Sequence, residues 1–231
     1  GRFLRLLARR GARAAGVELD AGVAAFANER LASRGRARAR AVVGDMCRLD
    51  ALNFPRGLGA PLDIAFSPHN SIRHVASPAD LRRHLSAMAA VLRPRGVYAV
   101  GVGLQRPGEP IVGEDVHKAR RGGLVVHNVC QYFEAPASGR VHTRRERIVS
   151  FTTVTTGRGA ARRRRTIESS YDLLCIDPAM WAAALRAAGM VELAVVDDER
   201  GADLPANRTD YAYRVIARSD HPMARANARL Q

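Results

Sequence analysis

The first hundred residues alternate short apolar runs with amphipathic segments, and this alternation constrains the fold more than any other feature. Four apolar runs are short enough for buried strands, at 14–17, 40–43, 62–66 and 97–102. Helical spacing of apolar residues occurs before and between them, at 3–10, 21–34 and 78–92. Strands that alternate with helices favour an α/β fold with a Rossmann-like, mostly parallel sheet and helices on both faces. Ligand sites in such folds lie at the carboxyl ends of the strands.

The pattern changes after Gly103, where a connector rich in proline and glycine spans 104–113. Three longer strands joined by turns are predicted at 124–133, 141–156 and 166–175. Such a series is typical of an antiparallel meander. A helix beginning at Asp177 and two further strands, 191–196 and 211–217, come after it. We therefore expect a core at 1–103, an antiparallel insert or cap at 104–176, the last helix and strands of the core at 177–218 and a frayed tail at 219–231.

The net charge of +15 raises the question of a nucleic-acid partner. Of the 37 basic residues only Lys118 is a lysine, which indicates compositional bias rather than selected phosphate contacts. The one run of charge, 162–165, falls at a predicted hairpin end, and the aromatic residues do not interleave with the arginines. A solvated basic surface is therefore favoured over a stacking platform for RNA, although RNA stays an alternative partner.

The remaining composition points to a globular chain. Hydrophobic residues make up 47% of it, enough to bury a core, and no apolar stretch reaches the ~20 residues of a membrane span. The three cysteines, Cys47, Cys130 and Cys175, are scattered and form no CxxC pair, so a reduced, cytoplasmic setting is expected. The spacing of the histidines is not that of a metal site, and no metal is predicted.

Several segments, taken in order, resemble a class I S-adenosylmethionine-dependent methyltransferase. Gly16–Asp20 looks like the end of that family's second strand, and Val43–Met46 looks like the end of its third. Leu62–Phe66 and the loop after it resemble the fourth strand and its loop. Leu92–Gly96 is similar to the Leu-Arg-Pro-Gly-Gly entry to the fifth strand, with arginine in place of one glycine. The stretch 171–196 resembles the family's late strand, helix and strand, and the meander corresponds to a variable insert.

The beginning of the sequence resembles a point inside that family's cofactor loop. Gly1–Ala8 looks like the segment just after the first strand and the glycine-rich loop, with Gly1 as the last glycine of the loop. The resemblance implies that the first strand and most of the loop precede Gly1, so residues 1–231 alone could be inactive. A different class of function, an inactive Rossmann-like fragment or binding module, is therefore kept as an alternative.

The resemblance implies S-adenosylmethionine as the cofactor and suggests which residues hold it. Glu18 ends a strand, where a carboxylate can accept hydrogen bonds from both ribose hydroxyls. Leu19 beside it can pack on the adenine face. Asp45 can accept from the adenine amino group while the amide of Met46 donates to a ring nitrogen. The alternatives are a solvated helix-start acid for Glu18, a core leucine for Leu19 and a loop cap for Asp45.

The loop after the fourth predicted strand is where a methyl acceptor would lie. Ser67 or Pro68 is expected to approach the cofactor sulfur. His74 is the candidate general base, with His69 as its competitor, because imidazole titrates near neutral pH. His74 could instead cap or pack on the following helix. Many methyl transfers need no base, since alignment alone can supply most of the rate.

Polar side chains of the meander either roof the acceptor pocket or lie where the meander pairs with another subunit in a homodimer. They are His127, Tyr132, His142 and Arg147. The sequence thus predicts an enzyme that moves a methyl group to an oxygen or nitrogen of a small molecule. An RNA methyltransferase is the first alternative, favoured by the net charge.

Overall fold

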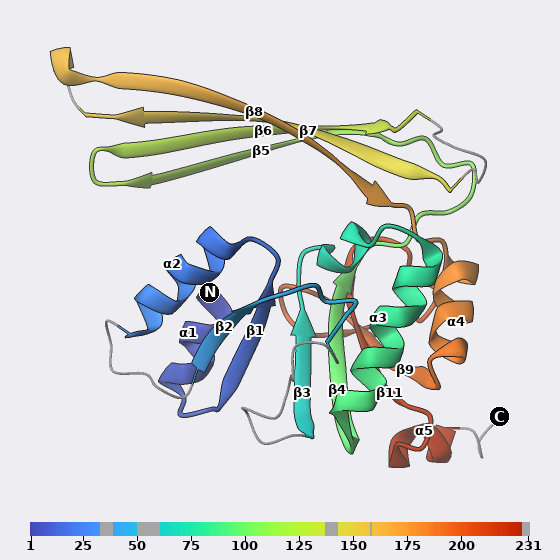
Figure 1. The fold of residues 1–231 in the computed structure, drawn as a ribbon. Helices are drawn as coiled ribbons and strands as arrows, with labels where there is room; N and C mark the ends of the chain where they lie inside the picture. The colour runs from blue at the N-terminus through green and yellow to red at the C-terminus, as the bar shows by residue number, and fades with distance from the viewer. Residues whose placement is uncertain (33–38, 50–60, 137–142, 158, 228–231) are drawn as a thin grey trace.

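The computed structural model describes residues 1–32, 39–49, 61–136, 143–157 and 159–227 (Figure 1). An α/β core carries both termini, and a long antiparallel sheet, which we call the arm, lies across one end of that core. In the described part of the chain, no helix is long and apolar enough to cross a membrane.

The N-terminal part of the core is a small parallel sheet flanked by two helices. Helix α1 (Arg2–Arg9) leads to strand β1 (Ala14–Glu18), and helix α2 (Ala21–Ala32) leads to strand β2 (Ala39–Val43). The two strands pair in parallel, as the sequence predicts. Helix α2 begins after Asp20, whose carboxylate accepts a hydrogen bond from the first-turn amide of Val23 (2.8 Å).

A second sheet of five strands forms the rest of the core. Its strands are β3 (Leu62–Ser67), β4 (Leu92–Val102), β9 (Met190–Val196), β10 (Asp203–Leu204) and β11 (Ala212–Arg218). They are arranged in the order β10-β9-β11-β4-β3. Only β3 and β4 pair in parallel, whereas the pairs β4–β11, β11–β9 and β9–β10 are antiparallel.

The prediction of a mostly parallel sheet is therefore corrected to a mixed one. The reason lies in the connection between β9 and β11, which holds only loop residues and the short β10. A connection without a crossover helix turns the chain back and makes the two strands antiparallel. That helices cover both faces stays a prediction.

Two capped helices pack next to each other over the five-stranded sheet. Helix α3 (Pro78–Val91) begins after Ser77, whose side chain accepts from the amide of Asp80, and helix α4 (Pro178–Ala187) begins after Asp177 in the same manner. Each has proline in its first turn, where the missing amide costs nothing. Their apolar faces join one core cluster with the sheet, which includes Leu81, Leu85, Tyr98, Val100, Trp181 and Ile216.

The arm is a meander of four strands rather than the predicted three. Its strands are β5 (Val112–Arg121), β6 (Leu124–Glu134), β7 (Arg145–Thr156) and β8 (Arg163–Leu174), in that order. Strand β5 was not predicted, because it is rich in charged residues and every one of its residues is exposed at the edge of the sheet. Backbone pairing with β6, rather than burial, makes it a strand.

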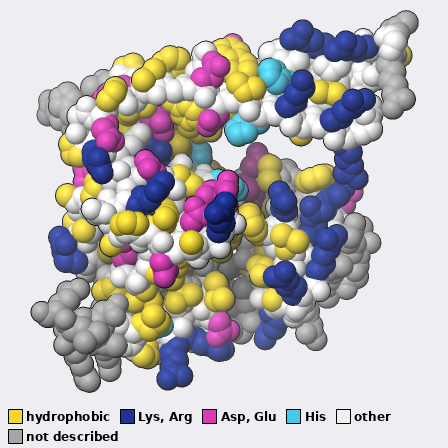
Figure 2. All heavy atoms as spheres, turned by 180° about the vertical axis from the view of Figure 1, so that it is seen from behind, with side chains coloured by type: hydrophobic (Ala, Val, Ile, Leu, Met, Phe, Trp, Pro, Cys, Tyr) yellow, Lys and Arg dark blue, Asp and Glu magenta, His cyan; other side chains and the backbone are white. Residues whose placement is uncertain are grey.

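The end of the arm far from the core is basic. Figure 2 shows Lys and Arg side chains gathered over this end, and open space between it and the core. The exposed arginines of β8 at 163–165 supply part of that charge. The expected frayed tail is also corrected, because helix α5 (Pro222–Asn227) forms within it.

Candidate functional site

Two of the predicted cofactor residues lie at neighbouring strand ends. Glu18 is the last residue of β1 and pairs in register with Val43, the last residue of β2. The amide of Gly44 donates to the Glu18 carbonyl (2.9 Å), so Asp45 follows at the same edge. Parallel pairing thus places two carboxylates at the ends of adjacent strands, as the sequence predicts.

Both carboxylates are engaged locally. The Glu18 side chain accepts from the amide of Asp20 (3.2 Å), and the Asp45 side chain accepts from the amide of Cys47 (2.8 Å). Each carboxylate has several lone-pair positions, so one such bond leaves acceptor capacity for a ligand. Leu19, expected against adenine, is 77% exposed and is therefore not a core leucine.

Gly1 lies against helix α2, and Met46 comes three residues after the end of β2. A side chain at Gly1 would meet the Cβ of Ala27 on α2 at 2.9 Å, so α1 approaches α2 only because residue 1 is glycine. The carbonyl of Met46 faces the core, where it accepts a hydrogen bond from the ring of His84 (2.9 Å).

The loop after β3 has an unusual backbone. His69 and Asn70 both have left-handed conformations, with φ of 55° and 58°. Consecutive residues of this kind carry strain, which clusters at functional sites. Two contacts hold the loop: Asn70 Oδ1 accepts from the amide of Gly103 (2.8 Å), and Tyr211 Oη accepts from the amide of His69 (3.0 Å).

Tyr211 is a site residue that sequence reasoning missed. Its phenol lies over Gly101 of β4, where any side chain would collide with the hydroxyl. The sequence signal for this contact was Gly101 inside a strongly apolar strand, because a glycine there marks the close approach of another group. Sequence pattern could not say that this group comes from residue 211, just before β11.

The next turn of the chain is the anchor of the arm. The short 3-10 helix η3 (Ser71–His74) contains Arg73, which is buried and pairs with Glu146 of β7 (2.7 Å). Arg73 also donates from Nε to the carbonyl of Leu174, at the end of β8 (2.9 Å). Satisfied by a carboxylate and a carbonyl, the buried guanidinium fixes the arm against the loop after β3.

His74 consequently lies under the arm. Its ring is 5.3 Å from the ring of Tyr171 on β8. Desolvation by this packing, with a smaller contribution from the Arg73 charge, lowers the pKa of His74. The imidazole is therefore neutral near pH 7 and can accept a proton.

The arm has an inner face that continues from this contact. Strand register places Tyr132, Ile148 and Tyr171 in one row across β6, β7 and β8, so Tyr132 shares a face with the residue that touches His74. Tyr132 donates to the Asp115 carboxylate (2.6 Å), and burial, together with that carboxylate, raises the pKa of Tyr132.

Other polar groups lie on the same inner face. Asn128 donates to the hydroxyls of Ser150 (2.6 Å) and Thr152 (2.7 Å). The other residues that the sequence predicted to cover the acceptor pocket are not on this inner face. Register places His127 and Arg147 on the opposite, outer face, where Arg147 pairs with Asp172 (2.8 Å). His142 lies outside the described residues.

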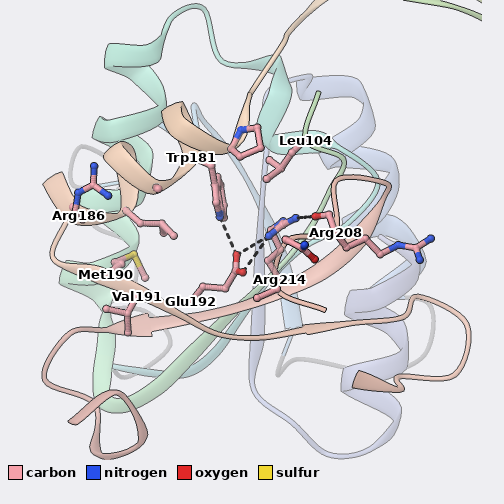
Figure 3. Close-up of a pocket in the computed structure, with 13 residues that line it drawn as sticks. Leu104, Trp181, Arg186, Met190, Val191, Glu192, Arg208 and Arg214 are labelled. Atoms are coloured by element: carbon pink, nitrogen blue, oxygen red, sulfur yellow. Dashed lines mark hydrogen bonds and ion pairs between the residues drawn. The ribbon is translucent and has the colours of Figure 1, made fainter. Parts of the chain in front are cut away.

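A cavity of about 340 Å³ lies elsewhere, between α4, β9 and β11 (Figure 3). Glu192 accepts from Trp181 Nε1 (3.0 Å) and from the buried guanidinium of Arg214 (2.9 Å) at its polar end. Arg214 also donates to the carbonyl of Arg208. None of the predicted cofactor residues lines this cavity, and its polar groups join α4 to β9 and β11.

The sequence of the N-terminal region matches one protein family. The model of this family, described as a methyltransferase domain, matches residues 1–96. The comparison with curated proteins found no match.

The fold is similar to those of solved methyltransferases. An S-adenosylmethionine-dependent methyltransferase from Clostridium acetobutylicum has 13% identity and a TM-score of 0.68, over 94% of this chain and 80% of that one. The sugar N-methyltransferase KedS8 from Streptoalloteichus has 20% identity and a TM-score of 0.63, over 94% and 84%. CalS10, an amino pentose methyltransferase from Micromonospora echinaspora, has 23% identity and a TM-score of 0.62, over 88% and 73%.

These findings define first a methyltransferase-like α/β fold with a mixed sheet and an added antiparallel sheet. The methyltransferase-domain match covers residues 1–96 of this fold, in agreement with the resemblance to class I S-adenosylmethionine-dependent methyltransferases. The match agrees with the predicted class of enzyme. CalS10 is described as bound to S-adenosylmethionine, the cofactor predicted for this chain.

Proposed function

We propose that this enzyme methylates a nitrogen atom of a small, hydroxylated molecule that binds between the loop after β3 and the inner face of the arm. The observation that carries the proposal is the contact between His74 and Tyr171, which brings the strained loop and the polar face of the arm to one place. Among similar structures, two are described as acting on a sugar nitrogen or an amino pentose.

The cofactor would be held at the ends of β1 and β2. Glu18 accepts from the ribose hydroxyls, and Leu19 covers the adenine. Asp45 accepts from the adenine amino group while the Met46 amide donates to the ring. Their position at adjacent strand ends supports these roles. Gly1 leaves room near the methionine end, and Ser67, the last residue of β3, lies nearest the sulfur in this arrangement.

The chemistry divides between the cofactor and the chain. When bound, S-adenosylmethionine supplies a methyl group activated by its positive sulfur. The chain aligns the acceptor nitrogen with that methyl group and excludes water, which together provide most of the acceleration. His74, neutral because its pKa is lowered, accepts the proton that the acceptor amine must lose.

The inner face of the arm suits an acceptor with several hydroxyl groups. It offers the carboxylate of Asp115, the phenol of Tyr132 and the amide of Asn128 within one surface. Hydrogen-bonding side chains in such a row reject an analogue that lacks the matching hydroxyl, because a desolvated partner is left unpaired. Tyrosine rings also provide flat apolar area for the faces of a ring-shaped ligand.

The direct test is cofactor binding by a Glu18→Ala variant, measured by calorimetry with S-adenosylmethionine. Losing charge-assisted hydrogen bonds worth about 1.5–3 kcal/mol should weaken binding roughly 10- to 100-fold. Glu29→Ala is the matched control, because it removes an exposed carboxylate from the other end of α2. Equal affinity in wild type and Glu18→Ala would remove the ribose role, and no binding by wild type would remove the cofactor assignment from this chain.

A further inference from the structure

A buried row of polar groups connects the two ends of the proposed cofactor site from inside the core. His84 of α3 is buried, with Nδ1 2.9 Å from the Met46 carbonyl and Nε2 2.8 Å from Tyr98 Oη. The Tyr98 phenol, itself buried in β4, has the Ser67 side chain as a further hydrogen-bond partner. None of the roles proposed for Met46 or Ser67 uses His84 or Tyr98.

The direction of each hydrogen bond follows from elementary chemistry. A carbonyl oxygen only accepts, so His84 Nδ1 carries a proton and donates it to Met46. Burial disfavours the charged ring and lowers the pKa of His84, so Nε2 is unprotonated and accepts from the Tyr98 hydroxyl. The Tyr98 hydroxyl, whose hydrogen points to His84, keeps a lone pair toward the Ser67 side chain. Every group in the row then has a partner and a single orientation.

The position of the row matters because it spans the two sheets of the core. Met46 follows β2, which belongs to the two-stranded sheet, while Ser67 and Tyr98 belong to the five-stranded sheet. Among the described residues, no strand pairing joins the two sheets. His84 therefore connects the loop expected at adenine with the strand end expected at sulfur.

We propose that His84 is a positioning residue that fixes the separation between the Met46 loop and Ser67, and so aligns the adenine end and the sulfur end of the cofactor. The proposal rests on the proposed function. It assigns His84 and Tyr98 to the methyl-transfer reaction although both are buried in the core. The row holds Met46 at one end and Ser67 at the other, and each end can be released separately by substitution.

Three variants test the Met46 end and the Ser67 end of the row separately. His84→Asn keeps a short donor toward Met46 but loses the acceptor for Tyr98, whereas His84→Gln extends toward Tyr98 and loses the Nδ1 donor. Tyr98→Phe removes the hydroxyl alone. Met88→Ala is the control, because it empties a buried position on the same helix outside the row.

Three quantities are measured: the affinity for adenosine, the affinity for S-adenosylmethionine and the kcat of methyl transfer. Together they distinguish a positioning role from a general loss of stability, which would lower all three. His84→Gln should weaken adenosine binding by about tenfold, the equivalent of one lost hydrogen bond. Tyr98→Phe and His84→Asn should leave adenosine binding within about twofold and lower kcat by about tenfold. Met88→Ala should lower the melting temperature and leave both readouts unchanged. Parallel losses in all four variants would overturn the proposal.

The tautomer of His84 is measured on the unmodified chain and does not depend on any variant folding. Nitrogen NMR of histidine-labelled protein should show Nδ1 protonated and Nε2 bare at pH 7. The opposite tautomer or a charged ring would overturn the proposal while leaving the proposed function intact. Absence of cofactor binding by the unmodified chain would instead overturn both.

Discussion

The two sheets of the core differ in how they are supported. In the five-stranded sheet, Val100 and Ile216 are fully buried beneath α3 and α4 and belong to the large core cluster. The two-stranded sheet instead has a small cluster of Ala14, Leu31 and Ala39. Burial of apolar area is the main stabilising term in folding, so most of the stability resides in the five-stranded part.

Strand β3, at the edge of the five-stranded sheet, is less well covered than its neighbour β4. Ile64 of β3 is 68% exposed and Phe66 is 42% exposed, although both lie in the strand next to the well-buried β4. Phe66 is partly covered by the ring of Phe3 from α1, at 4.9 Å, and by that of Tyr213, at 5.3 Å. The candidate site thus joins a stable half, which carries His74 and Ser67, to a weakly supported half, which carries Glu18 and Asp45.

The largest effect is expected on catalysis from the stable half. His74→Gln should lower kcat by about a hundredfold or more and remove the acidic limb of the pH–rate profile, since it removes the base. His69→Gln, a change of the same kind in the same loop, is the control. Equal activity of wild type and His74→Gln would mean that alignment alone carries the reaction.

The ion pair between Glu192 and Arg214 tests how strongly the five-stranded sheet is held. Glu192→Ala leaves a buried guanidinium without its carboxylate, which should lower the free energy of unfolding by about 3–5 kcal/mol. Denaturant unfolding measures this, and Glu199→Ala in the exposed loop after β9 is the control. A loss below about 1 kcal/mol would show that this sheet does not depend on the pair.

Matched leucine truncations compare the halves directly. Leu85 and Leu31 are both buried, in the large and the small cluster respectively. Leu85→Ala should lower the free energy of global unfolding by about 3 kcal/mol. Leu31→Ala should act mainly by local opening, which hydrogen exchange would show as faster exchange in β1 and β2 with β4 unchanged. Uniform acceleration of exchange by both variants would contradict the division.

The smallest expected effect is a pH dependence of stability, caused by His84, which connects the two halves. The pKa of His84 is lowered from its ordinary 6.5, so the unfolded chain takes up a proton at higher pH than the folded one. Stability should be complete above about pH 6.5 and fall on acidification, by at most about 1.4 kcal/mol per pH unit. The melting temperature of His84→Gln should fall less steeply on acidification than that of His117→Gln, the control at an exposed site. An unchanged slope would show that His84 does not titrate differently on folding.

Much of the candidate site could be predicted from local sequence. The position of Glu18 and Asp45 after apolar runs placed them at strand ends, because strand length and burial are local signals. The caps at Ser77 and Asp177 were equally readable, since a side-chain oxygen and the following proline act within one turn. The charged strand β5 was not predictable, because its pairing with β6 supplies the stabilisation that its composition does not.

The contacts between distant segments also lay beyond the sequence. Tyr211 over Gly101, Arg73 against Glu146 and His84 between Met46 and Tyr98 join residues far apart in the chain.

The sequence by itself determined the class of enzyme, its cofactor and the order of its elements, because those depend on periodicity, caps and motif order. Only the tertiary structure decided that the five-stranded sheet is mixed, that the arm turns Tyr132 inward and Arg147 outward, and that His74 lies under Tyr171. The physical reason is that strand direction, register and buried ion pairs depend on partners supplied by the rest of the fold.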